Sequence, residues 1–150
     1  SSGAKFRASV WDPWLILSQI AAMQSCYYTL LCLATLLMEA FSGQETALAH
    51  VLDYRVYRGD TVFGWTLGLG VMGCAAVSVL LLLRIVERAR LCLDYVVTLH
   101  FLHLIFTSYY SGHLPTTVFW WALNLASCCA MSIGGEWVCM RREMEPIMLS

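Results

Sequence analysis

The sequence predicts an all-α, polytopic membrane protein, a compact bundle of four transmembrane helices with both termini in the cytoplasm. Three observations support this fold class. The chain has four long apolar runs, only 13% of its residues are charged, and its lysines and arginines are distributed unevenly. A typical soluble domain has about 25% charged residues, which it needs to coat its surface. We therefore expect all 150 residues to form one membrane domain.

The four apolar runs have the length that a membrane requires. A helix needs roughly 20 residues to cross the hydrocarbon core of a bilayer, and soluble helices are rarely apolar on all sides for so long. A link of about 39–61 joins the first two runs, and an arginine-rich link of about 84–90 joins the second and third. The predicted helices cover about 14–38, 62–83, 91–111 and 116–140.

The distribution of positive charge predicts the orientation. Of the nine Lys and Arg residues, only Arg55 and Arg58 lie in the 39–61 link, which also contains four acidic residues. If the helices alternate in direction, the other seven lie on the opposite side of the membrane: Lys5, Arg7, Arg84, Arg88, Arg90, Arg141 and Arg142. Short segments rich in Lys and Arg stay in the cytoplasm. Both termini and the 84–90 link are therefore predicted to be cytoplasmic, and the 39–61 link lumenal.

The first two helices have local signals of their own. Asp12 is well placed as an N-cap, with Pro13 at the first helical position. The run that follows is too long for the core of a cleavable signal peptide, and more spans come after it, so we interpret it as a retained helix. In the second helix, Gly64 and Gly68 have the small-xxx-small spacing that lets helices approach closely. The same spacing would suit a homodimer.

The third helix has polar side chains in two directions. At about 100° per residue, Asp94 and Thr98 share one side, and His100 and His103 lie roughly opposite. We interpret the histidines, with Asn124 of the fourth helix, as neutral groups that order the helices through hydrogen bonds. Two histidines on one helix supply too few ligands for a metal or haem. No metal site and no cofactor is therefore predicted.

The fourth helix has an acid near its cytoplasmic end. Glu136 and Asp94 both fall within about a turn of the predicted membrane boundary, close to the arginines. A charge at the centre of a span costs roughly 2.5–3.5 kcal/mol on insertion scales, so intramembrane acids suggest function. In the ordinary interpretation, these two carboxylates pair with snorkelling arginines. In the functional interpretation, they belong to a polar pocket that opens to the cytosol.

Tryptophan gives an independent indication of the boundaries. The amphipathic indole ring prefers the membrane–water interface, where it forms aromatic belts. All six tryptophans fall near the predicted ends of spans, and a belt is the expected role for most of them: Trp11, Trp14, Trp65, Trp120, Trp121 and Trp137.

Several motifs resemble, in order, the Sys family of Golgi integral-membrane proteins. They are spread over nearly the whole chain, and the block CLDYVVTLHFLH is the most specific of them. The match is weakest in the lumenal link. The motifs are Phe6-Arg7, Val10–Pro13, Leu15–Ile20, Cys92–Thr98, His100-Phe101, His103, Trp120-Trp121, Gly135–Trp137 and Cys139–Arg141.

The resemblance implies a receptor on trans-Golgi membranes that acts in vesicle tethering and endosome-to-Golgi protein transport. Its partner would be an ARF-like small GTPase with an acetylated N-terminal amphipathic helix. We expect a cytoplasmic groove between the first, third and fourth helices to bind that helix, with membrane lipids around the bundle. Neither enzymatic activity nor nucleic-acid binding is predicted. The residues expected to line or support the groove are Trp11, Asp12, Gln19, Asp94, Thr98 and Glu136.

Two other functions are left open by the residues themselves. Four short helices with one membrane-embedded carboxylate could exchange protons for cationic substrates, which would make Glu136 the central residue of a small transporter. A membrane scaffold with no specific partner is the other. Both are less specific than the receptor hypothesis, because neither accounts for the matched motifs.

Overall fold

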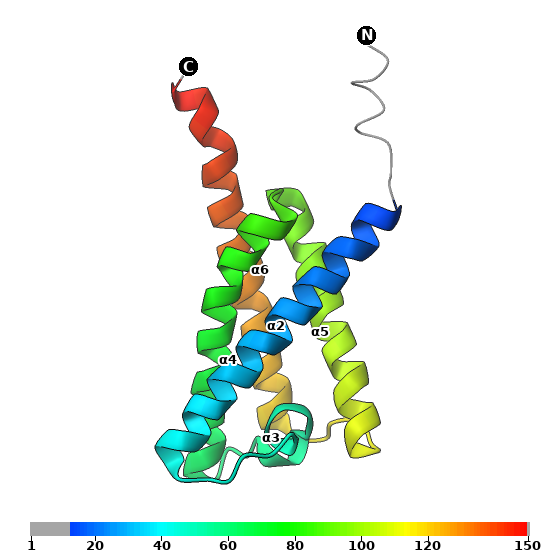
Figure 1. Cartoon of the computed structure of the whole chain (residues 1–150), viewed down its shortest axis with the longest axis vertical. Helices are drawn as coiled ribbons and strands as arrows, with labels where there is room; N and C mark the ends of the chain where they lie inside the picture. The colour runs from blue at the N-terminus through cyan, green and yellow to red at the C-terminus, as the bar shows by residue number, and fades with distance from the viewer. Residues whose placement is uncertain (1–12, 150) are drawn as a thin grey trace.

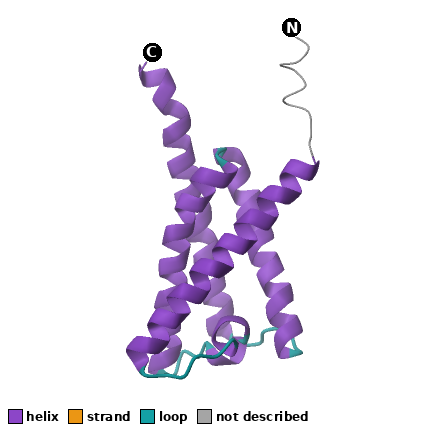
Figure 2. Cartoon of the chain, in the orientation of Figure 1, coloured by secondary structure: helices purple, strands orange, loops and turns teal. Residues whose placement is uncertain are grey.

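The computed structural model of the chain describes residues 13–149, with side chains from Pro13 to Met144, so Trp11 and Asp12 lie outside the described residues. Within this part of the chain every regular element is a helix (Figure 2). Four helices are long and apolar enough to cross a membrane, which confirms the predicted all-α fold with four candidate spans. The elements are α2 (Pro13–Ser42), α3 (Ala49–Leu52), η1 (Tyr54–Val56), α4 (Val62–Leu81), η2 (Leu82–Val86), α5 (Ala89–Ser111) and α6 (Val118–Leu149).

The four long helices do not contact one another equally. α4 packs against both α2 and α6, α5 packs mainly against α6, and α2 crosses the bundle diagonally (Figure 1). The lipid tails are as apolar as the side chains, so close packing and hydrogen bonds hold such a bundle together. The largest fully buried side chains come from all four helices and include Met23, Tyr27, Leu67, Leu99 and Met131.

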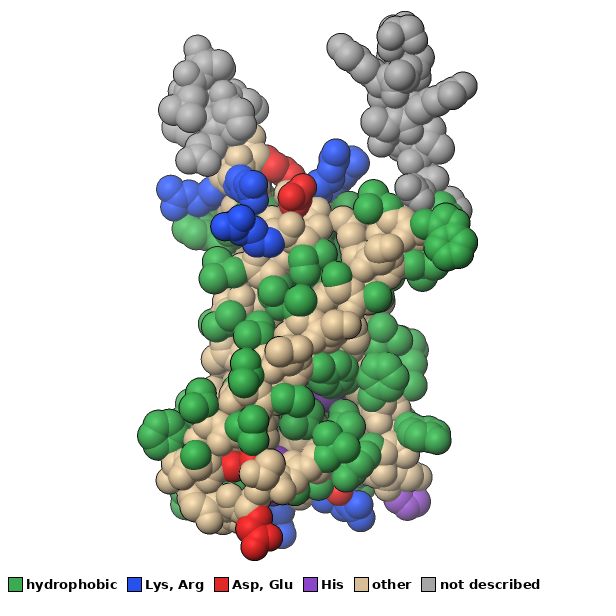
Figure 3. All heavy atoms as spheres, in the orientation of Figure 1, with side chains coloured by type: hydrophobic (Ala, Val, Ile, Leu, Met, Phe, Trp, Pro, Cys, Tyr) green, Lys and Arg blue, Asp and Glu red, His purple; other side chains and the backbone are tan. Residues whose placement is uncertain are grey.

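The two ends of the bundle differ in charge. α2 begins and α6 ends at the same end, where the turn between α4 and α5 also lies (Figure 1). We call it the arginine end, because it contains Arg84, Arg88, Arg90, Arg141 and Arg142. The loop end contains the segments 43–61 and 112–117. Figure 3 shows charged side chains gathered at both ends, with a mostly uncharged band between them. This distribution suits a protein that spans a bilayer.

The helices extend beyond the predicted apolar runs. α2 continues to Ser42, and α6 continues past Met140 to Leu149. Apolar composition stops at a membrane boundary, but a helix does not have to. Arg, Glu and Met all have high helix propensity, and the residues directly after Met140 are of these types. Hydropathy therefore predicts which residues lie within the membrane, whereas helix propensity determines how far the helix continues beyond it.

The turn between α4 and α5 is tighter than the predicted 84–90 link. α4 runs directly into the five-residue π-helix η2, whose end is closed by a 2.9 Å hydrogen bond from the Glu87 N–H to the Leu82 carbonyl oxygen. Glu87 has a φ of 67°, in the left-handed region that terminates helices, and Arg88 is extended before α5 begins. This short reversal makes α4 and α5 neighbours and gathers the arginines of the link in one place.

Glycines lie where helices come closest. A Cβ added at Gly134 would lie 2.9 Å from Val79 Cγ2, and one added at Gly135 would lie 2.5 Å from Leu82 Cδ1. These glycines let α6 approach α4 near the arginine end. At Gly68, which the small-residue spacing singled out, a Cβ would meet Leu123 of α6 at 3.6 Å. That distance is an ordinary van der Waals contact, so the close packing depends on the glycines of α6 rather than on Gly68.

The tryptophan belt is present, with one exception. Trp14, Trp65 and Trp121 have exposed side chains in the first turns of their helices, and Trp137 is exposed on α6 near the predicted end of the fourth span. Trp120 is only 2% exposed, and its ring stacks on His103 with centroids 6.1 Å apart. Trp120 is therefore an exception to the belt that was expected for most of the tryptophans, because this ring packs inside the bundle.

An ion pair orders the loop end. Arg55 donates to Asp53 through Nε and Nη2, both at 3.0 Å, and through its backbone N–H. These hydrogen bonds hold the pKa of Asp53 below its usual value. A carboxyl with a lowered pKa stabilises the fold above its unfolded pKa, and this stabilisation is lost as the pH falls through the folded value.

We therefore expect Asp53→Asn to lower the thermal midpoint at pH 7, and the difference from the unsubstituted chain to shrink below about pH 4 and to disappear once the pH has passed the lowered pKa of the folded state. Thermal unfolding in detergent across this pH range measures it. The exposed pair Arg58–Asp60 provides the matched control, because Asp60→Asn should have a smaller effect. A difference that persists unchanged at low pH would contradict the assignment.

Candidate functional site

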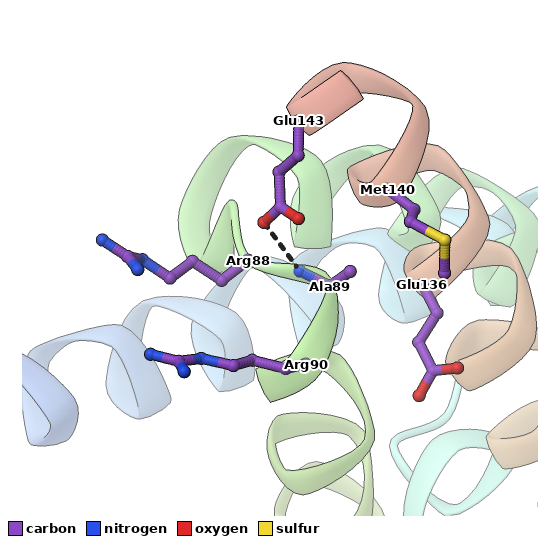
Figure 4. Close-up of a pocket in the computed structure, with 6 residues that line it drawn as sticks. All are labelled: Arg88, Ala89, Arg90, Glu136, Met140 and Glu143. Carbon is purple, nitrogen blue, oxygen red and sulfur yellow. Dashed lines mark hydrogen bonds between the residues drawn. The ribbon is translucent and has the colours of Figure 1, made fainter. Parts of the chain in front are cut away.

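A pocket at the arginine end is the candidate functional site. It has a volume of about 510 Å³ and lies between the first turn of α5 and the C-terminal half of α6. Arg88 and Arg90 extend together in one direction, whereas Glu136 points away from them (Figure 4). The lining residues are Arg88, Ala89, Arg90, Glu136, Met140 and Glu143.

Glu143 joins the two helices that form this pocket. Its Oε1 accepts a hydrogen bond of 3.2 Å from the Ala89 N–H, drawn as a dashed line in Figure 4. The first N–H groups of a helix have no partner within the helix, and its N-terminus has a partial positive charge. Arg88 and Arg90 add further positive charge at this N-terminus. A carboxylate from α6 is therefore favourable here, and it helps to hold α6 against α5.

Glu136 has no such partner. Among the described residues, it makes no ion pair with the arginines, although the ordinary interpretation of the sequence expected one. Of the two arginines that follow it in sequence, Arg141 lies over the Trp137 ring at 4.8 Å, and Arg142 donates instead to the Leu83 carbonyl oxygen at 3.4 Å. The carboxylate of Glu136 is thus available to a ligand that enters the pocket.

Gln19 connects three elements at the same end. Its Nε2 donates to the Ile85 carbonyl oxygen of η2 at 3.0 Å, and its Oε1 accepts from the Tyr95 hydroxyl of α5 at 2.6 Å. This side-chain amide, which lies within the first predicted span, thereby satisfies one backbone carbonyl and one hydroxyl group. The two hydrogen bonds set how α2 crosses α5. Gln19 is a positioning residue for this end of the bundle.

Asp94 and Thr98 lie on a different face from the pocket. Cys92 of α5 faces Cys139 of α6, with the two sulfur atoms 3.6 Å apart. Asp94 is two residues further along and so is turned by about 200° from Cys92. Its side chain is exposed, and Thr98 Oγ1 donates to its backbone carbonyl at 2.8 Å. The structure therefore does not bring Asp94 and Glu136 together, although one groove was expected to contain both.

Polar side chains deeper in the bundle form contacts between helices. His103 Nδ1 lies 2.8 Å from the Tyr28 hydroxyl of α2, and His100 Nε2 lies 3.2 Å from Ser127 Oγ of α6. His100 Nδ1 lies 3.0 Å from the Val96 carbonyl oxygen and so donates to it, which leaves Nε2 as an acceptor in a neutral ring. Asn124 makes a local bond, from Nδ2 to the Trp120 carbonyl oxygen at 2.9 Å.

The sequence interpretation missed the most deeply buried acid. It placed Glu39 in the lumenal link, but the residue lies in the last turns of α2 and is 2% exposed. Its Oε1 lies 2.6 Å from Nδ1 of His50, which belongs to α3. A signal was present, because the buried residues of α2 recur every four positions and Glu39 continues the series: Met23, Tyr27, Leu31, Thr35 and Glu39.

Four helices of spanning length, hydrogen bonds between them and a pocket lined by two arginines at one end define a polytopic membrane protein with a candidate binding site at one end of the bundle. Comparison with known proteins is more specific. A family model, SYS1, described as integral membrane protein S linking to the trans Golgi network, matches residues 6–149. The chain belongs to this SYS1 family, which confirms the resemblance seen in the motifs.

Two curated relatives carry the name Protein SYS1 homolog. One, from Nematostella vectensis, is 35% identical over 147 residues, which are 98% of this chain and 93% of the relative. The other, from Dictyostelium discoideum, is 32% identical over 144 residues, which are 96% of this chain and 62% of the relative. No solved structure matches the chain.

Proposed function

We propose that this chain recruits an ARF-like small GTPase to trans-Golgi membranes by binding the acetylated N-terminal amphipathic helix of the GTPase. Recruitment would serve vesicle tethering and endosome-to-Golgi protein transport. The observation that carries the proposal is the pocket of about 510 Å³ at the arginine end, which Glu136, Arg88 and Arg90 all line while the Glu136 carboxylate points away from the two arginines and pairs with neither. Membership of a family linked to the trans Golgi network supports the location.

Charge supports the cytosolic placement of this pocket. The arginine end contains five exposed arginines, together with the start of α2 and the end of α6. Segments rich in Arg remain on the cytoplasmic side. With both termini in the cytosol, the pocket faces the compartment in which a small GTPase circulates.

The pocket chemistry suits an acetylated helix. Even a myristoyl chain gives only marginal membrane binding, so a GTPase with only an acetyl group needs a protein to hold it. Acetylation removes the positive charge of the α-amino group, which makes the helix end easier to bury. The unpaired N–H groups of that end would donate to Glu136. Arg88 or Arg90 would donate to the acetyl oxygen, and Met140 would pack on the apolar face.

The other predicted residues take supporting roles in this proposal. Gln19 holds α2 across α5 at this end. Asp94 and Thr98 would contact the GTPase at the exposed edge of α5, outside the pocket. Trp11 and Asp12 immediately precede α2 and would extend the surface. His100 and His103 would keep the helices in register below it, whereas the hydrogen bond of Asn124 stays within α6 and does not support the interhelical role expected for it.

Binding of N-terminal peptides to this protein in nanodiscs tests the proposal. The acetylated peptide should bind more tightly than the unacetylated peptide and than either peptide on empty nanodiscs. Glu136→Ala should weaken binding by about tenfold, since one hydrogen bond to a charged group is lost. Asp94→Ala should weaken it less, because Asp94 lies outside the pocket. Glu45→Ala, at the loop end, is the matched control and should bind normally.

Unchanged binding of the peptide and of the full GTP-bound GTPase to the Glu136→Ala, Asp94→Ala double variant would overturn the proposed site. The transporter hypothesis has a separate test. Proton-coupled uptake of a cationic substrate into proteoliposomes, abolished by Glu136→Gln, would favour it. Glu136 lines the pocket at the arginine end, near the predicted boundary of the fourth span and away from the membrane midplane, and this position favours the receptor.

A further inference from the structure

A second cavity lies at the opposite, loop end of the bundle. It has a volume of about 210 Å³ and is mostly apolar. The last turns of α2 form one wall, with Cys32, Thr35, Leu36 and Glu39, and the segment 46–48 with Val51 forms the other. None of these residues takes part in the pocket at the arginine end.

Glu39 is the charged side chain that lines this otherwise mostly apolar cavity. One carboxylate oxygen, Oε1, lies 2.6 Å from His50 Nδ1 and 3.4 Å from the Ala47 N–H. The other oxygen, Oε2, is buried and has no hydrogen-bond partner among the described residues. A buried acceptor without a partner costs free energy, and more so when it is charged. Glu39 is 2% exposed, so the cavity favours a ligand that brings a hydrogen-bond donor to Oε2.

The local charge favours a cationic donor. The only two arginines at the loop end are already paired, Arg55 with Asp53 and Arg58 with Asp60. His50 is therefore the one basic side chain that the described structure places against Glu39, and its ring also packs edge-on against Phe63 with centroids 4.9 Å apart. An ammonium group satisfies a buried carboxylate better than a neutral hydroxyl does, because its hydrogen bond is charge-assisted.

The size and position of the cavity suit a single apolar chain. Its volume is below the ~300 Å³ of ordinary small-molecule pockets, so it can hold a head group and the first part of a chain. Leu36 lines the cavity and is 45% exposed. Beyond it, the outer face of α2 carries the exposed side chains of Leu33 and Leu37, along which the rest of a chain could lie in the bilayer.

We propose that this cavity binds a single-chain amphiphile with an amine head, whose ammonium group donates to Glu39 Oε2 while its hydrocarbon chain passes Leu36 into the membrane. The occupant is a membrane lipid of the long-chain amine class. The site is independent of GTPase recruitment, because it lies at the other end of the bundle and shares no residue with the first pocket.

Photolabelling of the full chain in nanodiscs tests this site. The probes are a photoreactive, clickable long-chain primary amine and the alcohol and carboxylic acid of the same chain length. Labelled peptides are quantified by mass spectrometry. The amine should label the α2 and 46–51 peptides about tenfold more than the carboxylic acid, as expected for a charge-assisted hydrogen bond to a carboxylate. The alcohol should lie between them.

Three variants separate the site from general partitioning into lipid. Glu39→Gln keeps the side-chain shape and should remove the preference for the amine. Leu36→Trp narrows the mouth at a lipid-exposed position and should reduce labelling by all probes. Leu17→Trp is the matched control, since Leu17 is 57% exposed on the same helix, lies toward the arginine end and does not line the cavity. Equal labelling by the three probes, or amine labelling that survives Leu36→Trp, would overturn the proposal.

Discussion

Replacing Gly64 by alanine is expected to lower the free energy of unfolding by about 3 kcal/mol, since overpacking at a rigid contact costs this much. A Cβ at this position would overlap the Arg58 carbonyl oxygen and approach the Arg58 backbone nitrogen to 2.8 Å. The obstacle is backbone, so no rotamer change can relieve it. The Gly64 N–H also donates to Thr61 Oγ1 at 3.0 Å, so a shift here would break the N-cap of α4.

Gly73 of the same helix is the matched control. An added Cβ there meets nothing within 4 Å, and the residue is exposed. Gly73→Ala should stabilise the helix by about 0.5–1 kcal/mol, because alanine loses less backbone entropy on folding. Unfolding in mixed micelles with increasing denaturing detergent gives both values. Equal stability of the two variants would show that the 58–64 turn can move away.

Replacing His50 by alanine is expected to cost about 3–5 kcal/mol, the range seen when one member of a buried pair is removed. The contact of 2.6 Å between His50 Nδ1 and Glu39 Oε1 is the main interaction of a carboxylate that is almost completely buried. Without it, Oε1 retains only the 3.4 Å contact with the Ala47 N–H. The segment 46–52 would then lose its anchor on α2, and labelling of the loop end by water-soluble reagents should rise.

A double-variant cycle isolates this effect. In a Glu39→Leu background, His50→Ala should cost much less, because no buried carboxylate is left without a partner. His113→Ala, in the exposed loop before α6, should have almost no effect on stability and is the control for histidine loss. If His50→Ala costs the same with and without the carboxylate, the pair does not stabilise the loop end.

The four spans could be predicted because the signal for a membrane helix is local. Each of the four apolar runs between 14 and 140 is long enough and apolar enough to be recognised as a span on its own. The helical phase of α5 also predicts correctly that Asp94, which is exposed, and His103, which is buried, lie on different sides of the helix. The ends of the helices were less predictable. Hydropathy falls at Met140, yet α6 continues, because charged residues outside the membrane are compatible with a helix.

The candidate site could be predicted only in part. The sequence singled out Glu136 and the neighbouring arginines, and these residues do line one pocket. It grouped Asp94 with Glu136 because both lie near the same boundary. Depth along the membrane can be read from sequence, but the direction in which a side chain points relative to another helix cannot. That direction depends on the rotation of α5 about its axis, which Gln19 and the Cys92–Cys139 contact help to set.

The sequence by itself determined the class of this protein: four membrane helices, an arginine-rich end and membership of the SYS1 family. Only the tertiary structure decided which polar residues are buried. Trp120 and Glu39 both lie near a predicted membrane boundary, where an indole ring is stable at the interface and a carboxylate is stable in water. Each is instead covered by residues distant in the chain, Trp120 by His103 and Glu39 by His50. The physical reason is that burial is a sum over contacts between helices, whereas composition and hydropathy report one segment at a time.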